Sequence, residues 1–299
     1  MTATSVDGQT LAGESLFVRY YNFVKLPHTL FALPFALLGV IYASFEQALT
    51  ARVVVLVVLA FTGARFAAMG FNRIVDRDLD ALNPRTSARE LPTGRLSVGQ
   101  AAVSVVLASV VFVSCAAALN TLCLVLSPMA LIWILAYSFT KRFTSWSHLW
   151  LGASLGIAPV GGYLAVTGAW SQPPWTLIAI AIGVLTWVAG FDMFYALQDA
   201  TFDRGHGLKS VVVVLGDRWS ILVAKLLHGI TILMLIAFAL GTPFGAWYYV
   251  GVVISAVILA WEHHLVQPGD LGKLDSAFFQ MNGVMSVVVF AFALGDRLL

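Results

Sequence analysis

The stretch that decides the fold of this chain is NRIVDRDLD, residues Asn72–Asp80. It directly follows a near-continuous apolar run over residues 53–71, which is long enough for a membrane-length helix. Asn72, Asp76 and Asp80 are four residues apart, so on a helix that continues out of the apolar run their side chains lie on one face. Acidic side chains at the end of such a helix are costly to dehydrate, and this makes them candidates for function.

A second group of oxygen-bearing side chains follows another apolar run, residues 179–190. Asp192, Tyr195 and Asp199 are spaced i, i+3, i+7, which places them on one helical face, and Asp203 extends the row. Two such faces suit Mg2+, which binds through a few carboxylates and shares the rest of its coordination shell with phosphate oxygens. The sequence therefore predicts a metal-dependent site for a diphosphate at the ends of two apolar helices.

The composition is that of a polytopic membrane protein. Of the 299 residues, 60% are hydrophobic and 11% are charged, whereas soluble proteins carry about 25% charged residues. The chain has no basic stripe with interleaved aromatic side chains, so we expect the lipid bilayer as its partner and no nucleic acid. The first 18 residues are polar and mixed, without the pattern of a secretory signal. We expect a polar tail over residues 1–20 and a single transmembrane domain over residues 21–299.

The apolar segments predict an all-α fold with nine transmembrane helices. They are too long and too uniformly apolar for outer-membrane strands, in which polar and apolar positions alternate. The nine segments lie at residues 24–44, 52–71, 98–118, 121–138, 149–167, 175–195, 221–240, 245–262 and 277–296.

The distribution of basic residues predicts the orientation of the chain. Lys and Arg concentrate at the N-terminus and in the longer, polar connections, whereas the opposite side carries Arg52 and Arg297. By the positive-inside rule, the N-terminus and the long connections are cytoplasmic. Both acidic groups then open toward the cytoplasm, in a multi-pass protein of the cell inner (cytoplasmic) membrane.

Basic side chains near the acidic groups can bind the same anion as the metal, because a guanidinium group pairs bidentately with phosphate. Arg77 lies between the carboxylates, Arg85 lies in the following loop, and Lys209 follows the second group. The alternative is a cytoplasmic loop whose arginines only fix the topology. Arg65 precedes Asn72 by seven residues and shares its face. We expect it to face a cavity, where it binds an aromatic acid, the diphosphate or a core carboxylate.

A diphosphate site inside a membrane protein suits a polyprenyl diphosphate, whose apolar tail belongs in lipid and whose charged head does not. Mg2+ makes diphosphate a better leaving group, so that an allylic C–O bond can ionise and an electron-rich phenol can capture the cation. The site must exclude water and stabilise charge.

The competing hypothesis is a transporter with acidic relay residues. Relay carboxylates are expected at mid-membrane depth, whereas these lie at one face beside arginines.

Several motifs together resemble the UbiA superfamily of intramembrane aromatic prenyltransferases, most closely the 4-hydroxybenzoate polyprenyltransferases of quinone biosynthesis. The resemblance covers about residues 20–297. Its carriers are Lys25-Leu26-Pro27-His28, the Asn72/Asp76/Asp80 motif followed by Arg85-Thr86, the Asp192/Tyr195/Asp199/Asp203 motif followed by Gly207-Leu208-Lys209-Ser210, and Asn282-Gly283.

The resemblance implies helices around a central cavity, with two Mg2+ ions that bind the diphosphate between the acidic motifs. It assigns metal and diphosphate binding to Asn72, Asp76, Asp80, Asp199 and Asp203. It also implies that Arg77 and Lys209 contact phosphate, and that Asp192 and Tyr195 line the acceptor side or support the cation. Lys25, Arg65 and Arg85 complete the expected substrate-binding set.

The acceptor differs between branches of the superfamily. Residues 85–97 and 195–199 look similar to members assigned to menaquinone synthesis through futalosine, where the acid is 1,4-dihydroxy-6-naphthoate instead of 4-hydroxybenzoate. The start of the first segment, Lys25-Leu26-Pro27, also departs from the Asp-Lys-Pro form of many 4-hydroxybenzoate enzymes. The resemblance therefore implies Mg2+-dependent transfer of a polyprenyl group to one of two planar phenolic acids in ubiquinone or menaquinone biosynthesis.

Overall fold

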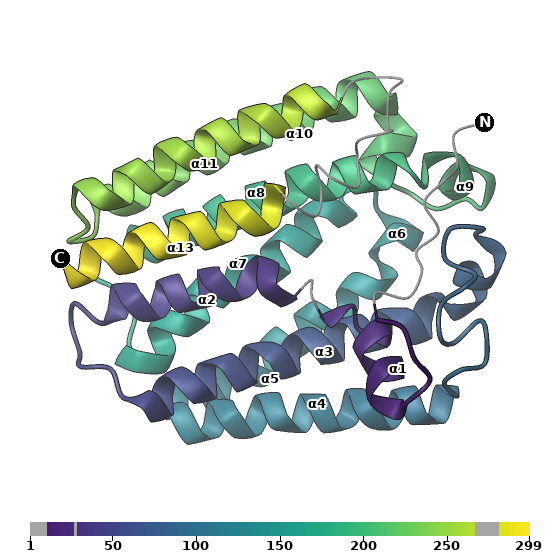
Figure 1. The fold of residues 1–299 in the computed structure, drawn as a ribbon, viewed down its shortest axis with the longest axis horizontal. Coiled ribbons are helices and arrows are strands. Elements are labelled where there is room, and N and C mark those ends of the chain that lie inside the picture. Colours follow the sequence, from purple (N-terminus) through teal and green to yellow (C-terminus); the bar gives the residue numbers. More distant parts are fainter. Residues whose placement is uncertain (1–10, 27–28, 267–280) are drawn as a thin grey trace.

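The computed structural model of this protein describes residues 11–26, 29–266 and 281–299 (Figure 1). These residues form helices and connecting loops without a strand among them, which confirms the predicted all-α class. Parts of the predicted segments 24–44 and 277–296, and of the polar tail 1–20, lie outside the described residues. Pro27 and His28 of the first motif lie outside them as well.

Each of the nine predicted apolar segments coincides with a long helix of the described chain. These helices are α2 (Thr29–Ala43), α3 (Ala51–Leu82), α4 (Val98–Leu119), α5 (Thr121–Ala136), α7 (Ser147–Thr167), α8 (Trp175–Leu197), α10 (Val211–Leu240), α11 (Ala246–Leu265) and α13 (Asn282–Leu298). The short elements are α1 (Leu16–Phe23), η2 (Tyr137–Phe139), α6 (Thr140–Phe143) and α9 (Ala200–Gly205). Within the described residues, seven helices are long and apolar enough to cross a membrane, so the chain is a multi-pass membrane protein. Nine spans and a cytoplasmic N-terminus stay predictions.

Two helices extend about ten residues beyond their predicted apolar segments. The third helix, α3, continues past residue 71 to Leu82, so the whole Asn72–Asp80 stretch is helical. Helix α10 begins at Val211 instead of residue 221 and contains a kink at Gly216, whose φ of 75° is accessible to glycine without strain. Hydropathy identifies only the apolar part of a helix. The backbone hydrogen bonds that define the helix continue into residues with polar side chains.

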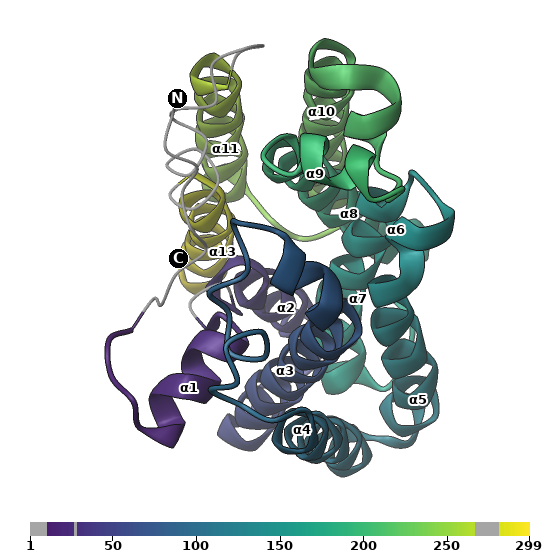
Figure 2. The same cartoon turned by 90° about the vertical axis from the view of Figure 1, so that its right-hand side faces the viewer.

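The long helices lie roughly side by side in one bundle, so their ends gather at two opposite sides of the molecule (Figure 1). Helix α8 packs against α7 and α10, and α3 packs against α4. The end-on view shows α6, α9 and the loop between α3 and α4 at the same end of the bundle (Figure 2). These segments follow α5, α8 and α3, and this arrangement brings the two acidic motifs to one end.

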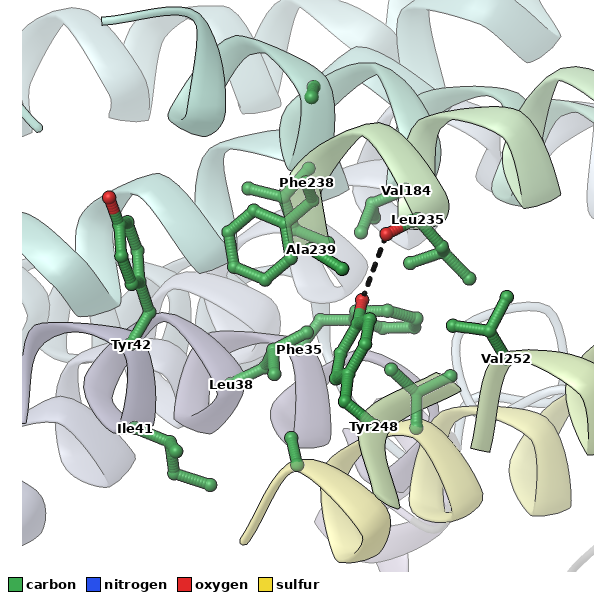
Figure 3. Packing of buried hydrophobic residues seen from close by; sticks show 14 of the residues in the cluster. Phe35, Leu38, Ile41, Tyr42, Val184, Leu235, Phe238, Ala239, Tyr248 and Val252 are labelled. Atoms are coloured by element: carbon green, nitrogen blue, oxygen red, sulfur yellow. Dashed lines mark hydrogen bonds between the residues drawn. The ribbon is translucent and has the colours of Figure 1, made fainter. Parts of the chain in front are cut away.

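Helix α8 is the most buried of the candidate membrane spans. Its Val184 packs in a cluster with Phe35 and Leu38 of α2 and with Phe238 of α10 (Figure 3). In the same cluster the Tyr248 hydroxyl donates to the Leu235 carbonyl oxygen at 3.4 Å. This packing fixes α8 from several sides and therefore fixes the direction of the polar side chains near its end.

Helices α2 and α7 approach each other closely because glycines lie at their crossing. A Cβ atom added at Gly39 would lie 1.9 Å from the Pro159 carbonyl oxygen, and one added at Gly162 would lie 2.0 Å from the Ala36 carbonyl oxygen. Both distances are clashes with backbone, so a larger side chain at either position would push the helices apart. The crossing positions α7, which forms one wall of the cavity described next.

Candidate active site

A cavity of about 480 Å³ extends from the acidic ends of α3 and α8 into the apolar part of the bundle. Helices α3, α5, α7 and α8 supply most of its wall. Both acidic motifs and several basic side chains line one end, and apolar side chains such as Phe61, Leu126 and Leu155 line the rest. The cavity therefore matches a molecule with a charged head and an apolar tail.

The first acidic motif is held on one face of α3, as its spacing predicts. The Asn72 side-chain amide donates to Asp76 Oδ2 at 2.9 Å, one helical turn away. Arg142, which belongs to α6, donates to Asp76 Oδ1 at 2.9 Å. One oxygen of Asp76 is thus taken by an amide and the other by a guanidinium group.

Asp80, one turn beyond Asp76, is buried and also engaged by arginine. Arg89 donates to Asp80 Oδ1 at 2.6 Å, and the Arg73 guanidinium lies 4.0 Å from Asp80 Oδ2. Arg89 comes from the loop after α3, which folds back over the helix end because the Thr86 hydroxyl donates to the Asp80 carbonyl oxygen at 3.0 Å.

The loop after α3 also joins the two acidic motifs. Arg85 donates through Nε to Asp199 Oδ1 at 2.8 Å and through Nη2 to Asp199 Oδ2 at 2.5 Å, which is a bidentate pair. The same guanidinium donates to the Tyr195 hydroxyl at 2.5 Å, and the Asn83 amide donates to Asp199 Oδ1 at 3.0 Å. Residues more than 100 positions apart therefore share one polar cluster.

The environment of Asp199 keeps this carboxylate ionised. Burial alone would raise its pKa, because it disfavours the charged form. The hydrogen bonds and charge of Arg85, with help from Lys141 and Asn83, outweigh burial, and the pKa of Asp199 lies below its ordinary value. An ionised, arginine-bound carboxylate of this kind can exchange its cation partner for a metal ion.

The remaining two carboxylates of the second motif have different partners. Lys141 of α6 donates to Asp203 Oδ2 at 3.1 Å. His148 of α7 lies with Nδ1 2.7 Å from Asp192 Oδ2. Four carboxylates thus pair with Arg or Lys, and Asp192 pairs with an imidazole.

Most of the residues predicted from the sequence line this cavity. They are Lys25, Arg65, Asn72, Asp76, Asp80, Arg85, Asp192, Tyr195, Asp199 and Asp203. Lys25 is the one described non-glycine residue with a positive φ, 49°, and such backbone strain is common at functional sites.

Two predicted phosphate contacts, Arg77 and Lys209, do not belong to the cavity wall. Arg77 is exposed and lies 3.4 Å from Asp78, because it is one residue after Asp76 and so about 100° around the helix from the acidic face. Lys209 is also exposed, and its Nζ donates to the Phe143 carbonyl oxygen at 3.3 Å. Arg73 and Arg89 approach the acidic face in place of Arg77.

Several cavity residues were not predicted from the sequence, among them Tyr137, Lys141, Arg142 and His148. Lys141 and Arg142 contributed only to the orientation of the chain. The signal that could have identified Lys141 and Arg142 is their position shortly after an apolar segment, because the first acidic motif also follows such a segment. Nothing in the sequence indicates that this third helix end meets the other two.

The donor set fits Mg2+ only together with a further anion. No group of three or more His, Cys, Asp or Glu side chains in the described residues forms a metal cage by itself. Mg2+ needs no such cage, because one or two carboxylates with phosphate oxygens and water complete its octahedral shell. Carboxylates from two helix ends offer such ligands, and the guanidinium groups between them can pair with phosphate oxygens.

The family description "UbiA prenyltransferase family" matches residues 32–284, which is most of the chain and includes both acidic motifs. The chain belongs to the UbiA prenyltransferase family. Within it, the 4-hydroxybenzoate octaprenyltransferase of Vibrio cholerae serotype O1 is 31% identical over 233 residues, which cover 78% of this chain and 81% of that protein. The resemblance stated from the motifs is confirmed, and this UbiA-family protein is an enzyme, a prenyltransferase, instead of a transporter.

Solved structures agree with this assignment. The apo structure of a UbiA homolog from Aeropyrum pernix K1 superposes with a TM-score of 0.82 at 32% identity, covering 90% of this chain and 98% of that chain. A UbiA homolog from Archaeoglobus fulgidus bound to GPP and Mg2+ shares the fold, with a TM-score of 0.70 at 21% identity, covering 94% of this chain and 100% of that chain. The described bundle is therefore the UbiA fold.

Proposed function

We propose that this UbiA-family prenyltransferase transfers a polyprenyl group from a polyprenyl diphosphate to a ring carbon of a planar phenolic acid, with Mg2+, in the cell inner membrane. The observation that carries the proposal is the cavity, in which carboxylates and guanidinium groups fill one end and apolar side chains line the rest. The names of relatives, 4-hydroxybenzoate octaprenyltransferases, support this class of acceptor. The GPP and Mg2+ bound by the Archaeoglobus fulgidus homolog support the donor and the metal.

In this proposal the polar end of the cavity binds the diphosphate. Arg85, Arg89 and Lys141 now neutralise carboxylates and would be shared with phosphate oxygens when the diphosphate binds. Asn72, Asp76, Asp80, Asp199 and Asp203 would hold Mg2+, which when bound withdraws charge from the diphosphate leaving group. The apolar wall around Phe61 and Leu155 receives the tail and keeps water from the allylic cation.

Arg65 is the group best suited to the acceptor carboxylate. It lines the cavity two turns deeper along α3 than Asn72. Its guanidinium makes no hydrogen bond or ion pair with any described residue. The structure therefore does not support the expectation that Arg65 pairs with a carboxylate in the protein core. An unpaired guanidinium inside a membrane-spanning bundle needs an anion, and an aromatic acid oriented by it would present its ring toward the polar end of the cavity.

The acceptor branch is the part of the proposal that needs a direct measurement. Membranes that contain the protein would be incubated with a polyprenyl diphosphate and Mg2+, and with either 4-hydroxybenzoate or 1,4-dihydroxy-6-naphthoate. We expect an adduct with one acid, detected by mass, that disappears when EDTA removes the metal. If folded protein releases diphosphate but forms no adduct with either acid, the result would contradict the acceptor class but not the diphosphate site.

A further inference from the structure

His148 and Asp192 form a contact that binding of the diphosphate head does not explain. Asp192 lies on the cavity face of α8, and His148 is the second residue of α7. Their side chains approach to 2.7 Å between Nδ1 and Oδ2. Among the carboxylates of the two motifs, Asp192 is the one whose described partner is an imidazole and not a lysine or an arginine.

The hydrogen positions of this pair follow from its chemistry. An ionised carboxylate can only accept, so the imidazole donates from Nδ1. In the neutral imidazole Nε2 then carries a lone pair, and this atom is buried without a hydrogen-bond partner among the described residues. The His148 side chain is 0% exposed and that of Asp192 is 16% exposed. His148 therefore borders the cavity with a fully buried side chain, and Asp192 is the partly exposed member of the pair.

One carboxylate oxygen of Asp192, Oδ1, has no hydrogen-bond donor among the described residues. Oδ2 accepts from His148, whereas Oδ1 accepts no hydrogen bond from a described residue. In Asp76, Asp80, Asp199 and Asp203 a lysine or an arginine binds the carboxylate. These cations would have to be displaced before the oxygens they bind could take up a proton. Oδ1 of Asp192 can take one up without that displacement.

We propose that His148 is a positioning residue that holds Asp192 through Oδ2, so that Oδ1 accepts the proton released from the acceptor ring. This inference rests on the proposed function. In the step, a C–C bond forms between the allylic carbon and the ring carbon, and the allylic C–O bond breaks so that diphosphate leaves with the electron pair. The ring C–H bond then breaks, its electrons restore the aromatic ring, and the proton moves to Oδ1. Without the Nδ1–H donor, the Asp192 side chain can rotate, and proton transfer slows.

Two substitutions at His148 separate positioning from packing. Asparagine keeps an N–H donor at the place of Nδ1 but leaves empty volume in a fully buried site. Glutamine fills the volume better and moves its donor one bond further out. If His148 only packs, His148→Gln should be at least as active as His148→Asn. If it positions Asp192, the order is reversed.

The measurement is kcat and KM for both substrates with each variant, with an acceptor that carries hydrogen or deuterium at the reacting ring carbon. We expect His148→Asn to keep kcat within about threefold of the wild-type enzyme and His148→Gln to lose about 100-fold, with the KM for the diphosphate unchanged. We also expect the deuterium effect on kcat to increase in His148→Gln, because proton removal becomes rate-limiting.

Two outcomes would overturn the inference. The first is a kcat in His148→Gln equal to or above that of His148→Asn, whether or not both have lost activity. The second is a lower kcat in His148→Gln without a larger deuterium effect. Failure of the proposed function has a separate signature, because the wild-type enzyme would then form no adduct with either acid. Thermal unfolding of each purified variant in detergent identifies a loss that comes from misfolding.

Discussion

Two regions of this enzyme bury titratable side chains between helices, and they do so in different ways. At the polar end of the cavity, every carboxylate of the two motifs meets a basic side chain within 3.1 Å. The second region is a junction network between α8, α10, α11 and α13, and it lies outside the cavity wall. It consists of Trp187, His228, Glu262, His263 and Asn282.

The junction network is held mainly by neutral hydrogen bonds. The Trp187 indole donates to Asn282 Oδ1 at 2.8 Å, and the Asn282 amide donates to Glu262 Oε1 at 2.8 Å. His228 Nε2 lies 3.2 Å from the Trp187 carbonyl oxygen and must donate to it. His228 Nδ1 therefore accepts from His263 Nε2, 3.0 Å away. This chain of donors and acceptors ties four helices together.

The difference shows what buried polarity is used for in each region. Ion pairs beside a cavity can be exchanged for those of a bound diphosphate and its metal ions, so they favour function at a cost in stability. A network of amide, indole, imidazole and carboxyl groups without access to the cavity cannot exchange partners in this way. It specifies how helices pack, and its loss leaves buried groups unpaired. Substitutions in the two regions should therefore change different observables.

The largest effect is expected for Asp76→Ala and Asp199→Ala. Each removes a carboxylate from the polar end of the cavity, and we expect transfer to fall by at least about 100-fold because charge at the leaving group is no longer stabilised. The unfolding temperature of Asp76→Ala should change little, because the Arg142 side chain that it leaves without this partner is 36% exposed. Asp78→Ala is the matched control, because Asp78 lies on the same helix but is exposed. Wild-type turnover in either cavity variant would contradict the metal-site assignment.

A smaller effect is expected for Arg65→Ala. Loss of a charged hydrogen-bond donor should weaken binding of the acceptor acid by about 10- to 100-fold. Steady-state kinetics should show this as a raised KM for the acid. An unchanged KM for both substrates would mean that Arg65 binds neither anion.

Asn282→Leu in the junction network should change stability without changing activity, the opposite of the cavity variants. This substitution leaves the Trp187 indole and Glu262 Oε1 without partners, so we expect a loss of about 2–3 kcal/mol in the free energy of unfolding. The activity of the folded fraction should remain, since Asn282 does not line the cavity. Thermal unfolding in detergent gives the stability, and Val284→Ala on the same helix serves as the control. Lost activity at full stability would contradict the division between the two regions.

The smallest effects are expected for Arg77→Ala and Lys209→Ala. The resemblance to the family implies phosphate contacts for both, whereas both side chains are exposed and neither lines the cavity. We therefore expect the KM for the diphosphate to change by less than about threefold. A larger increase would show that these side chains turn toward the diphosphate when it binds.

The sequence by itself determined the elements and much of the chemistry. Hydropathy is a local property, so the apolar segments located every long helix of the described chain. Helical periodicity is local as well, and the i, i+4, i+8 spacing correctly placed Asn72, Asp76 and Asp80 on one face of α3. The same periodicity could have excluded Arg77 from that face.

Only the tertiary structure decided which helix ends meet. Arg85 reaches Asp199, Arg142 reaches Asp76, and His148 reaches Asp192. These contacts join residues from 44 to 114 positions apart. A sequence pattern gives the direction of a side chain from its own helix axis. It does not give the rotation and offset of one helix against another, which depend on packing such as the glycine crossing of α2 and α7. The sequence alone therefore does not predict which residues pair with the carboxylates, because these pairs depend on how the helices pack.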